Sequence, residues 1–336
     1  MRSTFVLRWV LTVLAVACAS SCSVSTRDPL PSWADGPAKR SVLQFVQQVT
    51  DRSTKDFVEP VDRVAVFDND GTLWVEQPLY VQVLFAADQM KAVAAQHPEW
   101  KADPAFEKVI TGGPEAILQL PGKDQFAVAF AVHAGQSTEQ YAAAVARWLA
   151  THQHPRFHRP YTGLAYQPMI ELMRYLRAKQ FTVYSVTGGE TGFARVVNEA
   201  AFGVERTQVI GTLLKSQFDG STKPAQLTAL PDLLMLDDGD GKPESIGNVI
   251  GRRPILAFGN SDGDLSMLTY TATGPGLRFA ALVHHDDADR EYAYDRTSAV
   301  GHLDKALDAA QQKGWAVVSM KSDWKQIFPG SEKTAH

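Results

Sequence analysis

Cysteine is almost absent from this sequence of 336 residues. Its two cysteines, Cys18 and Cys22, lie near the N-terminus, so the rest of the chain lacks the residues that an internal disulfide requires. There is no dense block of lysine and arginine, and the formal net charge is -4. A protein with this charge has no general attraction for a polyanion, so we expect no nucleic-acid partner. Apolar runs of the roughly 20 residues that a membrane span needs are also lacking. A chain that is 45% hydrophobic and 21% charged can nevertheless bury the core of an ordinary enzyme.

Residues 1–22 have the pattern of a signal peptide. Arg2 and Arg8 accompany an apolar run that ends in small residues. Cys18 and Cys22 each end a stretch similar to a bacterial lipobox, although alanine stands where leucine is preferred three residues before either cysteine. Two alternatives follow: lipid attachment that anchors the protein to a membrane, or simple cleavage that releases a soluble enzyme. We expect an exported protein, periplasmic or associated with the cell envelope, and the sequence identifies no protein partner.

After a linker and N-terminal helix at 23–60, strand-like and helix-like segments alternate. Short apolar runs typical of strands buried on both faces occur at 63–67, 181–186, 208–211, 254–258 and 277–284. Amphipathic stretches of helical length separate them. This alternation predicts an α/β fold with a doubly wound, mostly parallel sheet, whose catalytic core comprises 61–73 and 167–330. In such sheets ligands bind beyond the carboxyl ends of the strands.

Two insertions interrupt the alternation. Residues 74–166 carry apolar residues at helical spacing, most clearly at 79–96 and 138–151, and loops rich in glycine and proline divide the helices. We therefore expect an inserted helical cap domain. In the second insertion, 212–236, alternating residues flank Phe218-Asp219-Gly220, which is typical of a β-hairpin.

Two carboxylates follow the first strand directly, in Asp68-Asn69-Asp70-Gly71-Thr72. In an extended chain, residues i and i+2 point to the same side, so both acids can face one spot. Such a pair can divide the work of catalysis, with one carboxylate ionised and the other able to donate a proton. A calcium loop is the alternative, but the preceding strand and the lack of a glutamate at the twelfth position argue against it.

The stretch from Phe67 to Thr72 resembles motif I of the haloacid dehalogenase superfamily of phosphohydrolases, and three further motifs appear in the expected order. They are Thr187-Gly188-Gly189, then Lys242 in Gly241-Lys242-Pro243-Glu244, and finally Gly259-Asn260-Ser261-Asp262-Gly263-Asp264. Together they span residues 64–268. The resemblance implies a Rossmann-like core, and the position of the cap is most similar to the phosphoserine phosphatase branch.

By this resemblance, Asp68 attacks phosphorus and forms an aspartyl-phosphate. Asp70 is expected to act as acid and then base, and because dehalogenases of the superfamily lack this second acid, we expect phosphate chemistry rather than carbon–halogen cleavage. Lys242 would neutralise the nucleophile and the transferred group. Phosphoryl oxygens would be held by the hydroxyl of Thr187 and by the amides of Gly188 and Gly189, which we expect at a helix start. Glu190 is either the N-terminal cap of that helix, which is the favoured interpretation, or a substrate contact.

The resemblance also implies a magnesium ion, bound by Asp68, the backbone carbonyl of Asp70, Asn260 and Asp264. Asn260 is a departure, because the family usually presents an aspartate there. Its amide oxygen can still bind the cation, but with one negative charge fewer. Asp264 then gains importance, a shifted loop would bring Asp262 into that role, and Asn260→Asp is expected to tighten magnesium binding.

Substrate choice depends on how the cap closes, so we expect only a small phosphorylated metabolite. Phosphoserine phosphatases place an acid just beyond motif I to bind the substrate amine. Gln77 stands at the matching step and Glu76 is displaced by one, so the resemblance does not extend to phosphoserine itself. Several aromatic residues are candidates for the cap pocket or the core: Trp74, Tyr80, Phe85, Phe126 and Phe130.

Two other functions remain as alternatives. Phosphonate cleavage needs an additional cap lysine, and Lys91, Lys101, Lys108 and Lys123 give no clear candidate. A catalytically silent binding lipoprotein would explain Asn260, but Asp68, Asp70 and Lys242 argue against it. His284, His285 and Asp286 are expected at the same edge of the sheet, without an assignable role as metal ligands.

Overall fold

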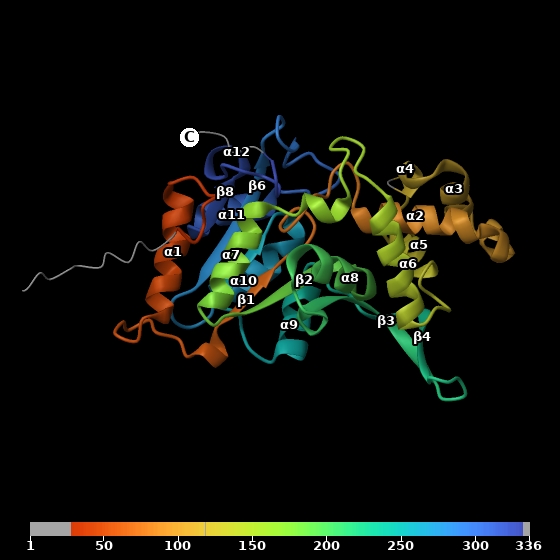
Figure 1. Cartoon of the computed structure of the whole chain (residues 1–336), viewed down its shortest axis with the longest axis horizontal. Coiled ribbons are helices and arrows are strands. Elements are labelled where there is room, and N and C mark those ends of the chain that lie inside the picture. The colour runs from red at the N-terminus through yellow and green to blue at the C-terminus, as the bar shows by residue number, and fades with distance from the viewer. Residues whose placement is uncertain (1–27, 118, 332–336) are drawn as a thin grey trace, which may run out of the picture.

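A central sheet organises the structure, a computed structural model that describes residues 28–117 and 119–331 (Figure 1). Its strand order is β4-β3-β2-β1-β5-β6-β7, with β8 paired to β6. The strands are β1 (Val64–Phe67), β2 (Thr182–Glu190), β3 (Val209–Asp219), β4 (Gln226–Met235), β5 (Leu256–Gly259), β6 (Phe279–Asp286), β7 (Ala293–Tyr294) and β8 (Ala316–Ser319). Strand β1 lies between β2 and β5 and is parallel to both. The predicted mostly parallel sheet is confirmed, with β4 and β7 antiparallel to their neighbours.

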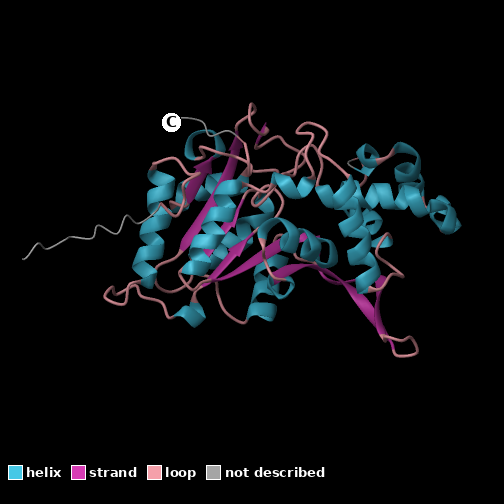
Figure 2. Ribbon diagram, viewed as in Figure 1, coloured by secondary structure: helices cyan, strands magenta, loops and turns pink. Residues whose placement is uncertain are grey.

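Helices cover both faces of this sheet (Figure 2). They are α1 (Pro37–Thr50), α7 (Gln167–Ala178), α8 (Thr191–Phe202), α9 (Gly241–Ile250), α10 (Leu265–Ala272), α11 (Lys305–Lys313) and α12 (Met320–Asp323). Successive side chains of a strand point to opposite faces. Accordingly, Ala65 and Phe67 of β1 pack in the apolar cluster that contains α1, α7 and α8, whereas Val64 and Val66 pack with α9, α10 and α11. Burial on both faces explains why β1 is a continuous apolar run.

The predicted helical insertion is present between β1 and α7. Its helices are α2 (Val81–Val93), α3 (Pro104–Gly112), α4 (Pro114–Ile117), α5 (Gly122–Ala131) and α6 (Thr138–Thr151), and they lie to one side of the sheet (Figure 1). Short 3-10 helices occupy Pro60–Asp62, Ala94–Gln96, Pro98–Ala102, Tyr161–Leu164, Arg206–Gln208 and Asp262–Asp264. Phe85 anchors the insertion to the core, because its ring packs against Trp148 of α6 and Phe193 of α8. The domain limits drawn from the sequence stay predictions.

The predicted β-hairpin is also present and consists of β3 and β4. The two strands pair in antiparallel register, with Phe218 opposite Leu227, and the ribbon projects away from the body beside the cap (Figure 2). An isolated bridge joins Ser137, before α6, to Thr228 of β4. The hairpin therefore contacts the cap through the part of β4 that lies near the turn.

Within the described ranges, no helix is long and apolar enough to cross a membrane. The predicted signal peptide at 1–22, including Cys18 and Cys22, lies outside these ranges. Export and lipid attachment stay predictions.

Candidate active site

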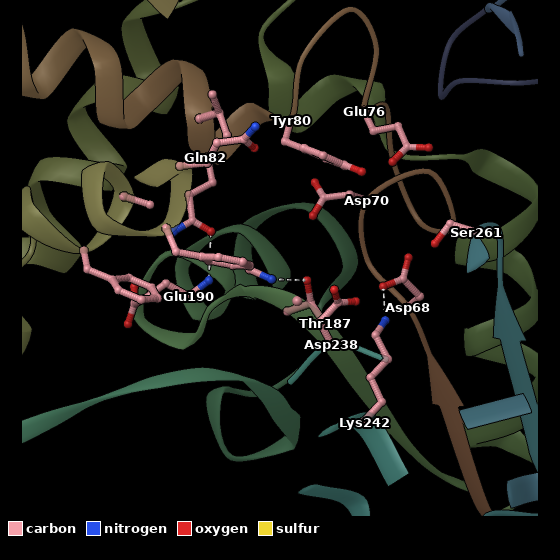
Figure 3. Close-up of a pocket in the computed structure, with 17 residues that line it drawn as sticks. Asp68, Asp70, Glu76, Tyr80, Gln82, Thr187, Glu190, Asp238, Lys242 and Ser261 are labelled. Atoms are coloured by element: carbon pink, nitrogen blue, oxygen red, sulfur yellow. Dashed lines mark hydrogen bonds and ion pairs between the residues drawn. The ribbon is translucent and has the colours of Figure 1, made fainter. Parts of the chain in front are cut away.

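The three motifs that follow β1, β2 and β5 meet at the carboxyl ends of these strands, as expected for this topology. Lys242 lies in the first turn of α9 and its buried ammonium has three acceptors. Its Nζ atom is 2.6 Å from Asp68 Oδ1, 2.7 Å from Asp264 Oδ1 and 3.1 Å from the carbonyl oxygen of Val186. Figure 3 shows the Lys242 side chain directed at Asp68. Burial alone would lower the pKa of Lys242, but the neighbouring carboxylates, Asp264 and Asp68 foremost, raise it above its ordinary value.

Asp264 orders the loop that follows β5. Its second oxygen, Oδ2, accepts hydrogen bonds from the backbone N–H of Asn260 at 2.9 Å and of Ser261 at 3.1 Å, while Oδ1 accepts from Lys242. Asp264 is fully buried. The expected ligand role of Asp264 stays a prediction.

Asp262 belongs to the same loop but points elsewhere. Its Oδ1 accepts from the backbone N–H of Asp304 at 2.9 Å and of Ala306 at 2.8 Å, and Oδ2 accepts from that of Lys305 at 3.2 Å. These amides form the N-terminus of α11 and favour a negative charge. The structure therefore holds this carboxylate at a helix terminus instead of beside Asp68.

Asp70 lines the same cavity as Asp68 and faces the space above it (Figure 3). Its Oδ1 accepts a hydrogen bond of 2.9 Å from Nε1 of the buried Trp74. Burial raises the pKa of Asp70 to about 6, although the bond from Trp74 opposes the rise. A carboxyl group whose pKa lies near neutrality is suited to donate and accept a proton in turn.

Oxygen atoms of the kind that bind hard cations lie close together beside Asp68. The hydroxyl of Thr72 lies 3.3 Å from Asp68 Oδ2 and 3.0 Å from Asn260 Oδ1, so both oxygens approach one point. Together with a backbone carbonyl they form the kind of set that magnesium takes. In the part of the chain that the structure describes, no group of three histidine, cysteine, aspartate or glutamate side chains is arranged for a metal. Amide and backbone oxygens would therefore have to complete a metal-binding set.

The charge balance of the site also fits a cation. Among the described cavity residues Lys242 is the one lysine or arginine, whereas five residues are acidic: Asp68, Asp70, Glu76, Glu190 and Asp238. Burial, followed by the charge of Asp264, raises the pKa of Asp68 to about 8, while Lys242 opposes the rise. A divalent cation beside Asp68 would reverse this shift and keep the carboxylate ionised.

Comparison with known proteins agrees with this geometry. The family model described as "Hydrolase: haloacid dehalogenase-like hydrolase" matches residues 63–268, more than half of the chain. The chain belongs to this family.

Two solved structures give the fold of this haloacid dehalogenase-like hydrolase further support. A protein of unknown function from Bordetella pertussis Tohama I is 17% identical with a TM-score of 0.51, and the match covers 76% of this chain and 97% of that protein. A conserved protein of unknown function from Anaerococcus prevotii DSM 20548 is 11% identical with a TM-score of 0.55, covering 89% and 96%. A phosphoserine phosphohydrolase-like protein from Francisella tularensis subsp. tularensis SCHU S4 is 12% identical with a TM-score of 0.38, covering 76% and 94%. Among curated proteins, no match was found.

Three residues of this hydrolase that are expected to bind phosphate lie at the end of β2 and line the cavity: Thr187, Gly188 and Gly189. The Thr187 hydroxyl accepts a hydrogen bond of 3.1 Å from the backbone N–H of Gly189. One expectation was wrong: Gly188 and Gly189 do not begin the next helix, because α8 starts at Thr191. Glu190 is its N-terminal cap and accepts hydrogen bonds from the backbone N–H groups of the first turn, at 2.8 and 3.0 Å.

The cavity of about 190 Å³ lies between the core and the cap. Of the aromatic candidates, Tyr80, Phe126 and Phe130 line it, whereas Trp74 and Phe85 are core residues. The cap side of the cavity is completed by two amide side chains and two small apolar residues: Gln82, Val83, Gln125 and Ala129. Glu76, rather than Gln77, reaches the cavity, since the Gln77 amide donates to Ser298 and to the carbonyl of Val300.

Residues to which the sequence assigned no role support the motif I turn. His285 Nε2 is 2.7 Å from the carbonyl oxygen of Gly71, and its Nδ1 is 3.2 Å from Glu291 Oε2. The hydroxyl of Tyr166 also contacts Glu291. These contacts give His285 a positioning role that the sequence did not reveal. Asp238 joins the cavity wall opposite the cap, and no motif pointed to it.

Proposed function

We propose that this haloacid dehalogenase-like hydrolase is a magnesium-dependent phosphatase that hydrolyses small phosphomonoesters through an aspartyl-phosphate on Asp68. The observation that carries the proposal is the buried contact of 2.6 Å between Lys242 Nζ and Asp68 Oδ1, at the floor of a cavity that Asp70 also lines. A carboxylate held by an ammonium at this point is positioned to attack a phosphorus atom that enters from the cap side.

The reaction would proceed in two displacements. In the first, an oxygen of Asp68 bonds to phosphorus, the bond from phosphorus to the alcohol oxygen breaks, and Asp70 gives its proton to that oxygen. In the second, water attacks phosphorus, Asp70 accepts the water proton, and phosphate leaves with the Asp68 carboxylate restored. A pKa near 6 lets Asp70 serve in both steps.

The remaining residues would bind the phosphoryl oxygens. Lys242 supplies the positive charge, and the hydrogen of the Thr187 hydroxyl is available because its oxygen accepts from Gly189. Asp68, the Asp70 carbonyl and Asn260 would hold the magnesium ion, which when bound neutralises charge on the phosphoryl group. Lys91, Lys101 and Lys108 are exposed and do not line the cavity, which favours phosphate ester hydrolysis over phosphonate cleavage.

The deciding experiment measures phosphate release from a panel of phosphomonoesters, with magnesium and with a chelator. We expect release that requires magnesium, with rates that differ among alcohols. Mass spectrometry of acid-quenched enzyme should find phosphate on the peptide that contains Asp68. If no ester releases phosphate in the presence of magnesium, the proposed phosphatase function is wrong.

We also propose that the enzyme acts outside the cytoplasm, on the basis of the pattern at 1–22. Cell fractionation and mass spectrometry of the mature N-terminus test this. A lipid-modified Cys18 or Cys22, or an N-terminus generated by cleavage in this region, would support export. An intact N-terminus on a cytoplasmic protein would contradict it.

A further inference from the structure

A glutamine of the cap contacts the strand end that carries the proposed phosphate-binding amides. Gln82 lies in the first turn of α2 and is 8% exposed. Its Oε1 atom accepts a hydrogen bond of 2.8 Å from the backbone N–H of Glu190, which Figure 3 marks with a dashed line. Glu190 is the last residue of β2. The contact therefore joins the cap directly to the end of this strand.

The end of β2 is not a regular part of the sheet. The register that pairs β2 with β1 ends at Ser185. The register with β3 shifts between Thr187 and Glu190, so Gly188 and Gly189 form a bulge. Glycine loses more conformational freedom than any other residue when it is held in one conformation. The bulge therefore depends on contacts that fix its geometry.

Hydrogen bonds from side chains hold this bulge. The Thr187 hydroxyl accepts from the backbone N–H of Gly189 at 3.1 Å, and the Thr212 hydroxyl donates to the carbonyl of the first glycine at 2.8 Å. Gln82 supplies the contact from the cap. A Cβ atom on Gly189 would lie 2.8 Å from Gln82 Oε1, so the lack of a side chain at this position is what lets the amide oxygen approach the bulge.

Packing holds the helix that carries Gln82 against the core. Gln82 and Phe85 are three residues apart and therefore lie on the same face of α2. The ring of Phe85 packs against Tyr141 of α6 and Phe193 of α8. Glu190 in turn caps α8 with its carboxylate. The Gln82 oxygen is thus presented to β2 from a fixed element, and a group that positions others needs such support.

We propose that Gln82 is a positioning residue that holds the bulge of Gly188 and Gly189 in the geometry that binds the phosphoryl group. The inference rests on the proposed phosphatase function. Every substrate brings the same phosphoryl group, whatever its alcohol. Loss of the Gln82 oxygen should therefore affect all esters by a similar factor, whereas loss of a residue that contacts the alcohol should affect some esters more than others.

The test uses two substitutions of Gln82 and one matched control. Gln82→Met has a side chain of similar length, and its sulfur is only a weak acceptor. Gln82→Glu keeps an accepting oxygen at the same position. Gln125→Met is the control, because Gln125 lines the same cavity but its amide donates within the cap, to the carbonyl of Leu120 at 2.9 Å.

Three quantities are measured for each variant at saturating magnesium: kcat/KM for esters of several alcohols, the inhibition constant of inorganic phosphate, and the melting temperature. We expect Gln82→Met to lower kcat/KM about tenfold for every ester and to weaken phosphate inhibition by a similar factor, because a buried N–H is left without its acceptor. Gln82→Glu should stay closer to the parent than Gln82→Met in both kinetic measurements. Gln125→Met should change the preference among alcohols and alter phosphate inhibition by less than about twofold.

Other results overturn the inference. If Gln82→Met lowers kcat/KM only for some alcohols and leaves phosphate inhibition unchanged, Gln82 contacts the alcohol instead. If only the melting temperature falls, the hydrogen bond is an anchor of the cap without a part in phosphate binding. If Gln82→Glu is as impaired as Gln82→Met, the oxygen is not the group that matters.

Activity of the parent protein separates this inference from the proposed function. If the parent releases no phosphate from any ester, the proposed function fails and the inference fails with it. If the parent is active and Gln82→Met has the same kinetic constants, only the inference is wrong.

Discussion

The core side and the cap side of the cavity are built differently. On the core side, the charged groups of Asp68, Lys242 and Asp264 hold one another at 2.6 and 2.7 Å. On the cap side, amides and aromatic rings such as Gln125 and Phe130 line the space. Fixed charges suit a reaction whose transition state is stabilised by preorganised groups. We therefore expect the core side to carry the reaction and the cap side to set the substrate preference.

The largest expected effect comes from the core side. Asp68→Asn should lower phosphatase turnover by about 10⁴-fold or more, because an amide of nearly the same shape cannot attack phosphorus. The melting temperature should change little by comparison, which a thermal unfolding measurement would verify. A rate near that of the parent would contradict the covalent mechanism.

Asp70→Asn should produce the next largest loss of phosphatase activity. Without a proton donor, departure of the alcohol should slow by about 10²- to 10⁴-fold, and most for esters of alcohols with a high pKa. Magnesium binding should be retained, since the backbone carbonyl of residue 70 is unchanged. Steady-state kinetics with good and poor leaving groups checks this, and an equal effect on both would count against the acid role.

A cap substitution should have a smaller and different effect. Phe130→Ala enlarges the cavity and should lower kcat/KM for a preferred substrate by about tenfold, the usual cost of removing an apolar pocket contact. The order of preference among substrates should change, while the magnesium concentration that gives half-maximal activity should not. If Phe130→Ala changes that concentration as strongly as it changes kcat/KM, the two sides are not separate.

The smallest effect on catalysis is expected at Asp262. Asp262→Ala removes the cap of α11 and should lower the free energy of unfolding by about 0.5–2 kcal/mol. The magnesium concentration that gives half-maximal activity should be the same as in the parent protein, because the Asp262 carboxylate contacts the backbone of residues 304–306. A sharp rise in that concentration would mean that Asp262 is the ligand after all.

The sequence predicts those parts of the fold that depend on neighbours in the chain. The apolar run before Asp68 indicates β1, and the motif residues then follow at the carboxyl ends of their strands because parallel strands share that edge. The start of α8 was not placed correctly, because the helix begins at Thr191. The two glycines expected at its start remain in β2, and Glu190 supplies the cap.

Contacts between distant residues have no comparable signal. Asn260 and Glu76 are 184 residues apart, and His285 is 214 residues from Gly71. A single sequence contains no periodicity that relates such positions, and it does not distinguish a buried glutamate from an exposed one. The orientation of the Asn260 amide and the support of the motif I turn therefore required the structure.

The ammonium of Lys242 has three N–H bonds, and the protein itself uses three acceptors: Asp68, Asp264 and Val186. An arriving phosphate can thus gain a donor from Lys242 only in competition with one of these partners. The contact to the Val186 carbonyl is the longest, at 3.1 Å, and involves no carboxylate, so it is the least costly to exchange. Val186 directly precedes Thr187, whose hydroxyl is proposed to bind phosphate, and both residues are paired with β3. A phosphate that took a donor from Lys242 would therefore exchange one hydrogen bond at the end of β2 while the strand stayed in the sheet.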